Sequence, residues 1–158
     1  MGDYDARLKR GFALIDKMGW PQERMLKQKD AYPDIYNLTV GHLFGDIWTR
    51  PHLSLREREL ITMAAIIAQG RPMGVATHFA SAIKNGISKE TIMELIIHVS
   101  AYAGWPVISH SIITFNQAME ELEAEKKAKA GARSKGKRKA QAAPKPKTKS
   151  RAGARAAA

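Results

Sequence analysis

The sequence has no cysteine among its 158 residues. This absence excludes disulfides, thiolate metal sites and CxxC exchange, and it leaves carboxylate, imidazole and phenol as the groups that can handle protons. An uninterrupted apolar run of about 18 residues, the length that a transmembrane helix needs, is also missing. The charged N-terminus is not followed by the hydrophobic segment of a signal peptide. We therefore expect a cytoplasmic protein without a membrane partner.

Acidic residues are missing from the C-terminal part of the chain. Residues 1–125 hold 13 Lys+Arg against 15 Asp+Glu, whereas residues 126–158 hold 13 Lys+Arg and no acid, so the net charge of +11 arises there. This second segment has no aromatic or large aliphatic side chain whose burial would offset the entropy of ordering it. The sequence predicts one folded domain, residues 1–125, and a disordered basic tail, residues 126–158.

A basic tail of this kind is suited to nucleic acid or another polyanion, through phosphate contacts and counterion release. Its densest basic cluster consists of Lys135, Lys137, Arg138 and Lys139. Because no aromatic residue is interleaved, base stacking is not expected. One hypothesis is therefore a non-enzymatic oligomer that binds polyanions through several tails, and the plain alternative is a solubilising extension without a function of its own.

The first 125 residues show helical periodicity and no alternating segment with hairpin turns. An S-x-x-E capping box at Ser54 and a second capping serine, Ser88, mark two helix starts. Residues 22–32 are interpreted as a charged link. The predicted helices span about 4–18, 33–50, 54–68, 75–86, 88–102 and 108–122. The fold class is therefore all-α, a compact bundle of about six helices.

Four polar groups lie within the apolar helical run of residues 53–122, where core packing would not choose them: Glu59, His78, His98 and Tyr102. They come from three consecutive helices, which a compact bundle can bring into one cavity. Histidine titrates near neutrality, so such a cavity would allow proton transfer at physiological pH. Each group also has an ordinary alternative, such as a hydrogen-bonded core histidine or a buried tyrosine ring.

His42 lies near Phe44 and Trp48 in the sequence, and it is a candidate for the wall of this cavity or a residue of ordinary packing. Phe44, Trp48 and Trp105 are further candidates for the walls. A metal site is the competing use of two histidines and a glutamate, but no H-x-x-x-H or E-x-x-H ligand pair is present. We expect neither a metal nor a cofactor.

Four motifs carry a family resemblance over residues 30–122. LFGDIW, RPHLSLRERE, the segment from THF to KNG and HVSAYAGWP follow one another in this order, and together they resemble the carboxymuconolactone decarboxylase family. The resemblance implies an all-α subunit in a ring-like homo-oligomer, a hexamer or a trimer. It also implies cofactor-free decarboxylation of γ-carboxymuconolactone, or of a similar lactone or β-keto-type acid, in aromatic-compound degradation.

Within this resemblance the candidate groups acquire roles. His78 is expected to act as general acid or enolate donor, Glu59 as its partner, and His98 with Tyr102 as donors to substrate oxygen. The related alkylhydroperoxidase D-like branch uses a glutamate, a C-x-x-C pair and a histidine. Carried onto this chain, its cysteines fall on Arg71 and Gly74, so a thiol peroxidase mechanism is excluded.

Overall fold

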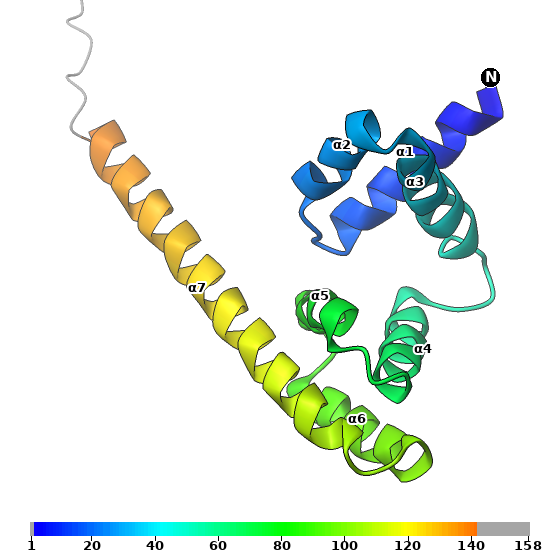
Figure 1. Ribbon diagram of the computed structural model, residues 1–158. Helices are drawn as coiled ribbons and strands as arrows, with labels where there is room; N and C mark the ends of the chain where they lie inside the picture. Colours follow the sequence, from blue (N-terminus) through cyan, green and yellow to red (C-terminus); the bar gives the residue numbers. More distant parts are fainter. Residues whose placement is uncertain (1, 142–158) are drawn as a thin grey trace, which may run out of the picture. The chain divides into compact units, whose positions relative to one another are not determined.

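The computed structural model describes residues 2–141, and the all-α fold class is confirmed because this part contains helices and no strand. Figure 1 shows the succession of elements. They are α1 (Gly2–Lys17), α2 (Gln22–Ala31), α3 (Pro33–Tyr36), the π-helix η1 (Asn37–Ile47), α4 (Leu55–Ala68), α5 (Pro72–Lys84), α6 (Lys89–Ala103) and α7 (Val107–Gln141).

The two predicted capping serines begin α4 and α6. Ser54 Oγ accepts a hydrogen bond from Glu57 N at 3.2 Å, and the Glu57 carboxylate accepts one from Ser54 N at 2.6 Å, which completes the capping box. Ser88 Oγ accepts from Thr91 N at 3.2 Å. These caps satisfy backbone donors that would otherwise lack partners at the helix starts. The start of α4 places Glu59 on the second turn of that helix.

The segment predicted as one helix from residue 33 to 50 is α3 followed by η1, and its buried face differs from the prediction. Val40 and Phe44 are buried, whereas Leu43 and Ile47 are 39% and 40% exposed. Hydrogen bonds in a π-helix join residues five apart, as from Trp48 N to Leu43 O at 2.9 Å. A turn therefore holds more than 3.6 residues. Val40 and Phe44, four residues apart, lie on one face of η1, whereas Leu43, three residues after Val40, lies on another.

The segment interpreted as a link, residues 22–32, contains the helix α2. Its apolar pattern is weak because Met25 is its main buried anchor, while Leu26 is 49% exposed. The helix contacts both α1 and α3, and the prediction of a link was wrong. This correction matters for function because α2 contributes Met25 and Gln28 to a cavity.

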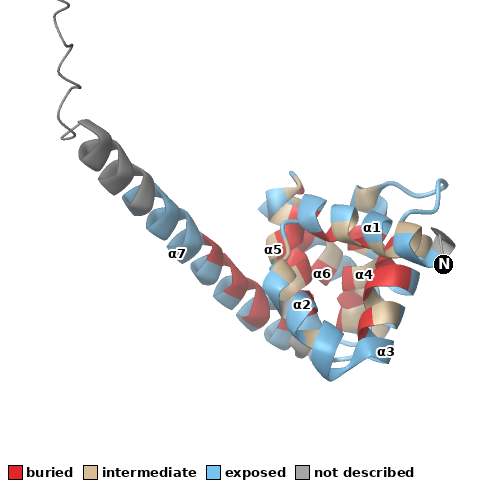
Figure 2. Cartoon of the chain, turned by 90° about the horizontal axis from the view of Figure 1, so that it is seen from above, coloured by how far each residue is buried: buried red, intermediate tan, exposed pale blue. Residues whose placement is uncertain are grey.

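Two clusters of buried apolar side chains stabilise the fold. Figure 2 shows the buried residues on the inward faces of the helices. The first cluster belongs to α1, α2, α3 and η1, with the loop after α1, and comprises Ile15, Met18, Met25, Tyr36, Val40 and Phe44. The second belongs to α4, α5, α6, the start of α7 and the turn before α6, and includes Met63, Phe79, Ile87, Ile92, Ile96 and Phe115.

The helices α1 and η1 approach each other closely through two glycines. A Cβ atom at Gly11 would lie 1.9 Å from Val40 O, and one at Gly45 would lie 2.3 Å from Arg7 O. Such distances are far below van der Waals contact, so only glycine permits this crossing. The crossing fixes the position of η1, which carries Phe44 near its end.

The chain separates by its contacts into a compact unit that ends at Leu122 and a segment that begins at Glu123. The helix α7 continues to Gln141, so it extends into the segment that was predicted as the basic tail. Alanine, lysine and arginine are strong helix formers, and ion pairs join Glu123 to Lys126 at 2.8 Å and Glu125 to Lys129 at 3.9 Å.

The remaining part of the predicted tail, residues 142–158, lies outside the described residues, as do the side chains of the basic cluster Lys135, Lys137, Arg138 and Lys139. Within the described range, none of the helices has the length and apolar character needed to cross a bilayer.

Candidate active site

A buried carboxylate and an imidazole from neighbouring helices form the centre of the site. Glu59 on α4 and His78 on α5 are 19 residues apart in sequence, and Glu59 Oε2 lies 2.7 Å from His78 Nδ1. Glu59 is 0% exposed and His78 is 7% exposed. Burial of a carboxylate requires such a partner. Because Nδ1 faces Glu59, Nε2 is the ring nitrogen that remains for a ligand.

The other oxygen of the Glu59 carboxylate is hydrogen-bonded to Ser81. Its Oγ donates a hydrogen bond to Glu59 Oε1 at 2.5 Å, and the side chain is 1% exposed. The sequence analysis missed this residue. The available signal was its spacing, since a residue three positions after His78 lies on the same face of α5.

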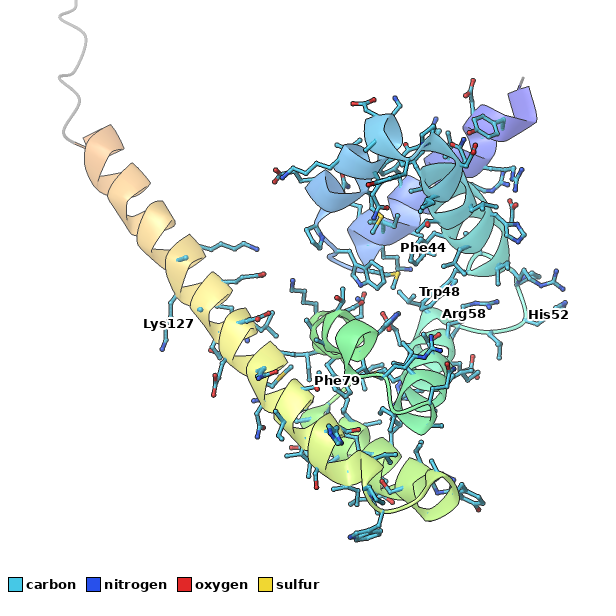
Figure 3. All side chains as sticks on the ribbon, in the orientation of Figure 1. Phe44, Trp48, His52, Arg58, Phe79 and Lys127 are labelled. Carbon is cyan, nitrogen blue, oxygen red and sulfur yellow. The ribbon has the colours of Figure 1, made fainter. Side chains whose placement is uncertain are left out.

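Two tryptophan side chains pack on the His78 ring. The ring of Trp48 stacks on it, with centroids 5.9 Å apart and an angle of 22°. Trp20 meets it edge to face at 5.0 Å and 75°. Phe44 contacts both tryptophans, at 5.2 and 5.7 Å. In Figure 3, Phe44 and Trp48 lie on the side of η1 toward α4 and α5, whereas His52 points away.

Phe44 and Trp48 were predicted as wall residues. Trp48 stacks on the His78 ring and Phe44 packs on the two tryptophans, but neither is among the residues that line the cavity described below. Trp20 was missed because the Gly-Trp-Pro sequence at residues 19–21 was interpreted only as a helix stop.

A cavity of about 290 Å³ opens beside His78. Its walls come from α5, α2, α3, η1 and the turn before α2, and its lining residues are Trp20, Pro21, Met25, Gln28, Ile35, Thr39, Gly74, Thr77 and His78. The volume lies near the lower limit of ligand pockets, about 300 Å³. The lining combines apolar side chains with neutral polar groups and one imidazole. A proton donor or acceptor thus faces a small, largely apolar space.

His98 and Tyr102 lie elsewhere, so the single cavity expected for the four candidate groups does not form within this chain. Both are on the exposed side of α6, Tyr102 is 83% exposed, and their ring centroids are 5.2 Å apart. At about 100° per residue, their strip lies about 120° around α6 from the buried Ile92 and Ile96. With α4 they border an open groove of about 440 Å³.

His42 and Trp105, also predicted as wall residues, do not line the cavity. His42 is on the outer side of η1, with Nδ1 3.5 Å from Asp46 Oδ2. Asp46 also pairs with Arg7 at 2.6 Å and Arg10 at 3.1 Å, and the hydrogen bond from Arg7 is the main cause that lowers the Asp46 pKa below its ordinary value. Trp105 is 69% exposed.

Among the described side chains, no three potential ligands cluster as a metal site.

Comparison with known proteins identifies the family. The model of the carboxymuconolactone decarboxylase family matches residues 33–116, which include Glu59, His78 and Ser81. The chain therefore belongs to the carboxymuconolactone decarboxylase family, and the resemblance in its motifs is confirmed.

Two relatives carry names of decarboxylases. A 4-carboxymuconolactone decarboxylase of Acinetobacter baylyi is 31% identical over 93 residues, which cover 59% of this chain and 69% of that protein. A nitrosuccinic acid decarboxylase npaB of Metarhizium robertsii is 29% identical over 79 residues, covering 50% and 55%. The chain thus spans about half the length of this second relative. Both relationships support a carboxy-lyase activity.

Proposed function

We propose that the protein is a cofactor-free decarboxylase of γ-carboxymuconolactone, or of a similar lactone or β-keto-type acid, in aromatic-compound degradation. The observation that carries the proposal is the His78 ring at the wall of the cavity, with its Nδ1 2.7 Å from the buried Glu59 carboxylate. The family and the decarboxylase names of the two relatives support the same class of reaction.

In the proposed reaction the bond between the substrate ring and its carboxylate breaks and CO₂ leaves. The electron pair of that bond flows through the ring double bond into the lactone carbonyl, which gives a dienolate. His78 Nε2 then donates its proton to carbon, so that hydrogen replaces the carboxylate and the enol-lactone of β-ketoadipate forms. The imidazole regains a proton from solvent, and the Glu59 carboxylate stabilises the imidazolium.

The surroundings of His78 favour this chemistry. Trp20, Met25 and Ile35 make much of the lining apolar. An apolar lining favours the charge-dispersed transition state over the solvated carboxylate of the substrate. Thr39 and Thr77 supply hydroxyl groups within the same lining, and a donor aimed at the developing enolate oxygen stabilises it.

The test is turnover of the purified full-length protein, followed by loss of lactone absorbance and by CO₂ release. We expect His78→Ala to lower kcat by about 10²- to 10⁴-fold, the usual contribution of a positioned general acid. Glu59→Gln should also lower kcat because it removes the charge opposite the imidazolium. His52→Ala, in an exposed loop, is the matched control and should retain activity. Full turnover by His78→Ala would contradict the proposal.

We also propose that the groove between α4 and α6 packs against a second copy of the chain. Ala64, Ala65 and Ala68 line it from α4, and Ile61, 54% exposed, continues the same stripe. Exposed apolar surface of this kind is typical of an interface. Light scattering after size-exclusion chromatography should give an oligomer for the native chain and a smaller mass for Ala64→Arg. Equal masses would refute this interface.

For the basic segment from residue 126 onward we propose binding to nucleic acid or another polyanion, in addition to the enzymatic role. The 13 positive charges without an acidic residue support it, because each neutralised phosphate releases counterions. The side chains of Lys126, Lys127 and Lys129 are exposed on α7.

A further inference from the structure

Buried hydroxyl groups on the helices α5, α6 and α7 divide into two kinds. Ser100, Ser111 and Thr114 each donate to the backbone carbonyl four residues earlier, at 2.7, 2.8 and 2.8 Å. This local bond is the ordinary choice of a serine or threonine inside a helix. Ser81 is buried in the same way, at 1% exposure, but its hydroxyl leaves its own helix and donates to Glu59 at 2.5 Å. The Ser81 hydroxyl therefore bonds to the Glu59 carboxylate and not to a carbonyl of its own helix.

Asn85, at the end of α5, sets the direction of the Ser81 hydroxyl. Asn85 Nδ2 donates to Ser81 O at 2.9 Å and lies 3.5 Å from Ser81 Oγ. A backbone carbonyl only accepts, so the amide atom that meets it must be the N–H end. A donor group consequently faces Ser81 Oγ on this side, and the hydroxyl hydrogen is directed to the other side, where Glu59 lies.

We propose that Ser81 is a positioning residue that keeps Glu59 as a hydrogen-bond acceptor and thereby holds a proton on His78 Nδ1. This inference rests on the proposed function, since it assigns Nε2 to the substrate. A hydrogen bond donated to a carboxylate favours its charged form. The charged carboxylate then accepts from Nδ1–H, and Nε2 carries its transferable proton only in the imidazolium.

The other side chains named around Glu59 and His78 are neutral, so we assign the effect on the Glu59 carboxylate to Ser81. Trp20 from the turn before α2 and Trp48 after η1 pack on the His78 ring, and both are neutral. The polar cavity residues Gln28, Thr39 and Thr77 are neutral as well. If the Ser81 hydroxyl is removed, Glu59 Oε1 loses its donor inside a site with 0% exposure. Glu59 can then take up a proton from solvent and become a hydrogen-bond donor. It donates to an Nδ1 without a proton, and the proton of the neutral histidine lies on Nε2.

The experiment is ¹⁵N NMR of the full-length protein labelled at its five histidines, at a pH at which neutral imidazole predominates. The signal that disappears in His78→Gln belongs to His78. We expect the Nδ1–H tautomer in the native protein and a gain of the Nε2–H tautomer in Ser81→Ala. The same variant should lower kcat by about 10- to 100-fold with little change in KM, the range for losing a hydrogen bond to a charged group.

Two variants separate this role from a general effect on folding. Ser100→Ala removes another buried serine hydroxyl, on α6, and should leave both the His78 signal and kcat unchanged. Ser81→Cys keeps nearly the same volume with a weaker donor, and it gives the same readout if Ser81→Ala does not fold. An unchanged Nδ1–H signal in a folded Ser81 variant would overturn the inference. A tautomer change in a protein without decarboxylase activity would support it and refute the proposed function alone.

Discussion

The crossing of α1 and η1 gives a sharp prediction about stability, because two glycines of η1 face α1 in very different surroundings. A Cβ at Gly45 would lie 2.3 Å from Arg7 O and 3.0 Å from Arg7 C, which are backbone atoms. A Cβ at Gly41 would lie 3.5 Å from Leu8 Cδ2, a side-chain atom at ordinary contact distance. Gly45→Ala and Gly41→Ala therefore add the same methyl group to one helix with opposite expected results.

The magnitudes follow from these distances. To bring the Gly45 contact to about 3.4 Å, α1 and η1 must separate by about 1.1 Å, and overpacking of this kind costs about 1–3 kcal/mol. The separation also lengthens the hydrogen bond from Arg10 Nε to Gly45 O, now 3.2 Å, a further loss of about 1 kcal/mol. Alanine regains about 1 kcal/mol through helix propensity. We expect Gly45→Ala to lower the free energy of unfolding by about 2 kcal/mol.

Gly41→Ala should change the free energy of unfolding by between zero and a gain of about 1 kcal/mol, since only the propensity term operates. Urea denaturation of both variants, with comparison of the midpoint and the slope, measures the difference. The shift of η1 in Gly45→Ala should also displace Trp48 from the His78 ring and reduce turnover. Equal stability of the two variants would refute the reasoning from the crossing.

Three further predictions concern other parts of the chain. Ser54→Ala removes the capping box of α4 and should lower the free energy of unfolding by about 1 kcal/mol in urea denaturation; a change near zero would show that the box does not contribute. The Asp46 pKa is lowered mainly by Arg7, so its stabilising contribution is present above the ordinary aspartate pKa and disappears as the pH falls through the lower folded value. The stability difference between the native chain and Asp46→Asn should therefore shrink with acidification, and a pH-independent difference would contradict this assignment. DNA binding by the full chain should weaken steeply with salt, whereas a chain ending at residue 125 should bind little; equal binding by both would remove the tail proposal.

The helix starts were predictable because their causes are local. A capping serine, its glutamate partner and the first helical turn lie within four residues, so the sequence contains the whole interaction at Ser54. The helix α2 and the π-helix η1 were not predictable in this way. The first has one buried anchor, Met25, and the second departs from the period of 3.6 residues on which the prediction of its buried face relied.

Two of the four candidate groups, Glu59 and His78, could be found from residue type and position in the sequence. Glu59 stands immediately before an apolar helical run and His78 beside an apolar stripe, and both are buried. The grouping with His98 and Tyr102 did not follow from the sequence, because periodicity shows that residues share a strip and not which neighbour the strip faces.

The sequence by itself determined an all-α fold, the capped starts of α4 and α6, the family, and the absence of thiol chemistry. Only the tertiary structure decided that Glu59 Oε2 meets His78 Nδ1, that Ser81 rather than Tyr102 joins them, and that Trp20 closes the site from a segment interpreted as a helix stop. The physical reason is the range of the interactions. Caps and helical faces depend on residues a few positions apart, whereas the surroundings of a buried carboxylate depend on how separate helices pack.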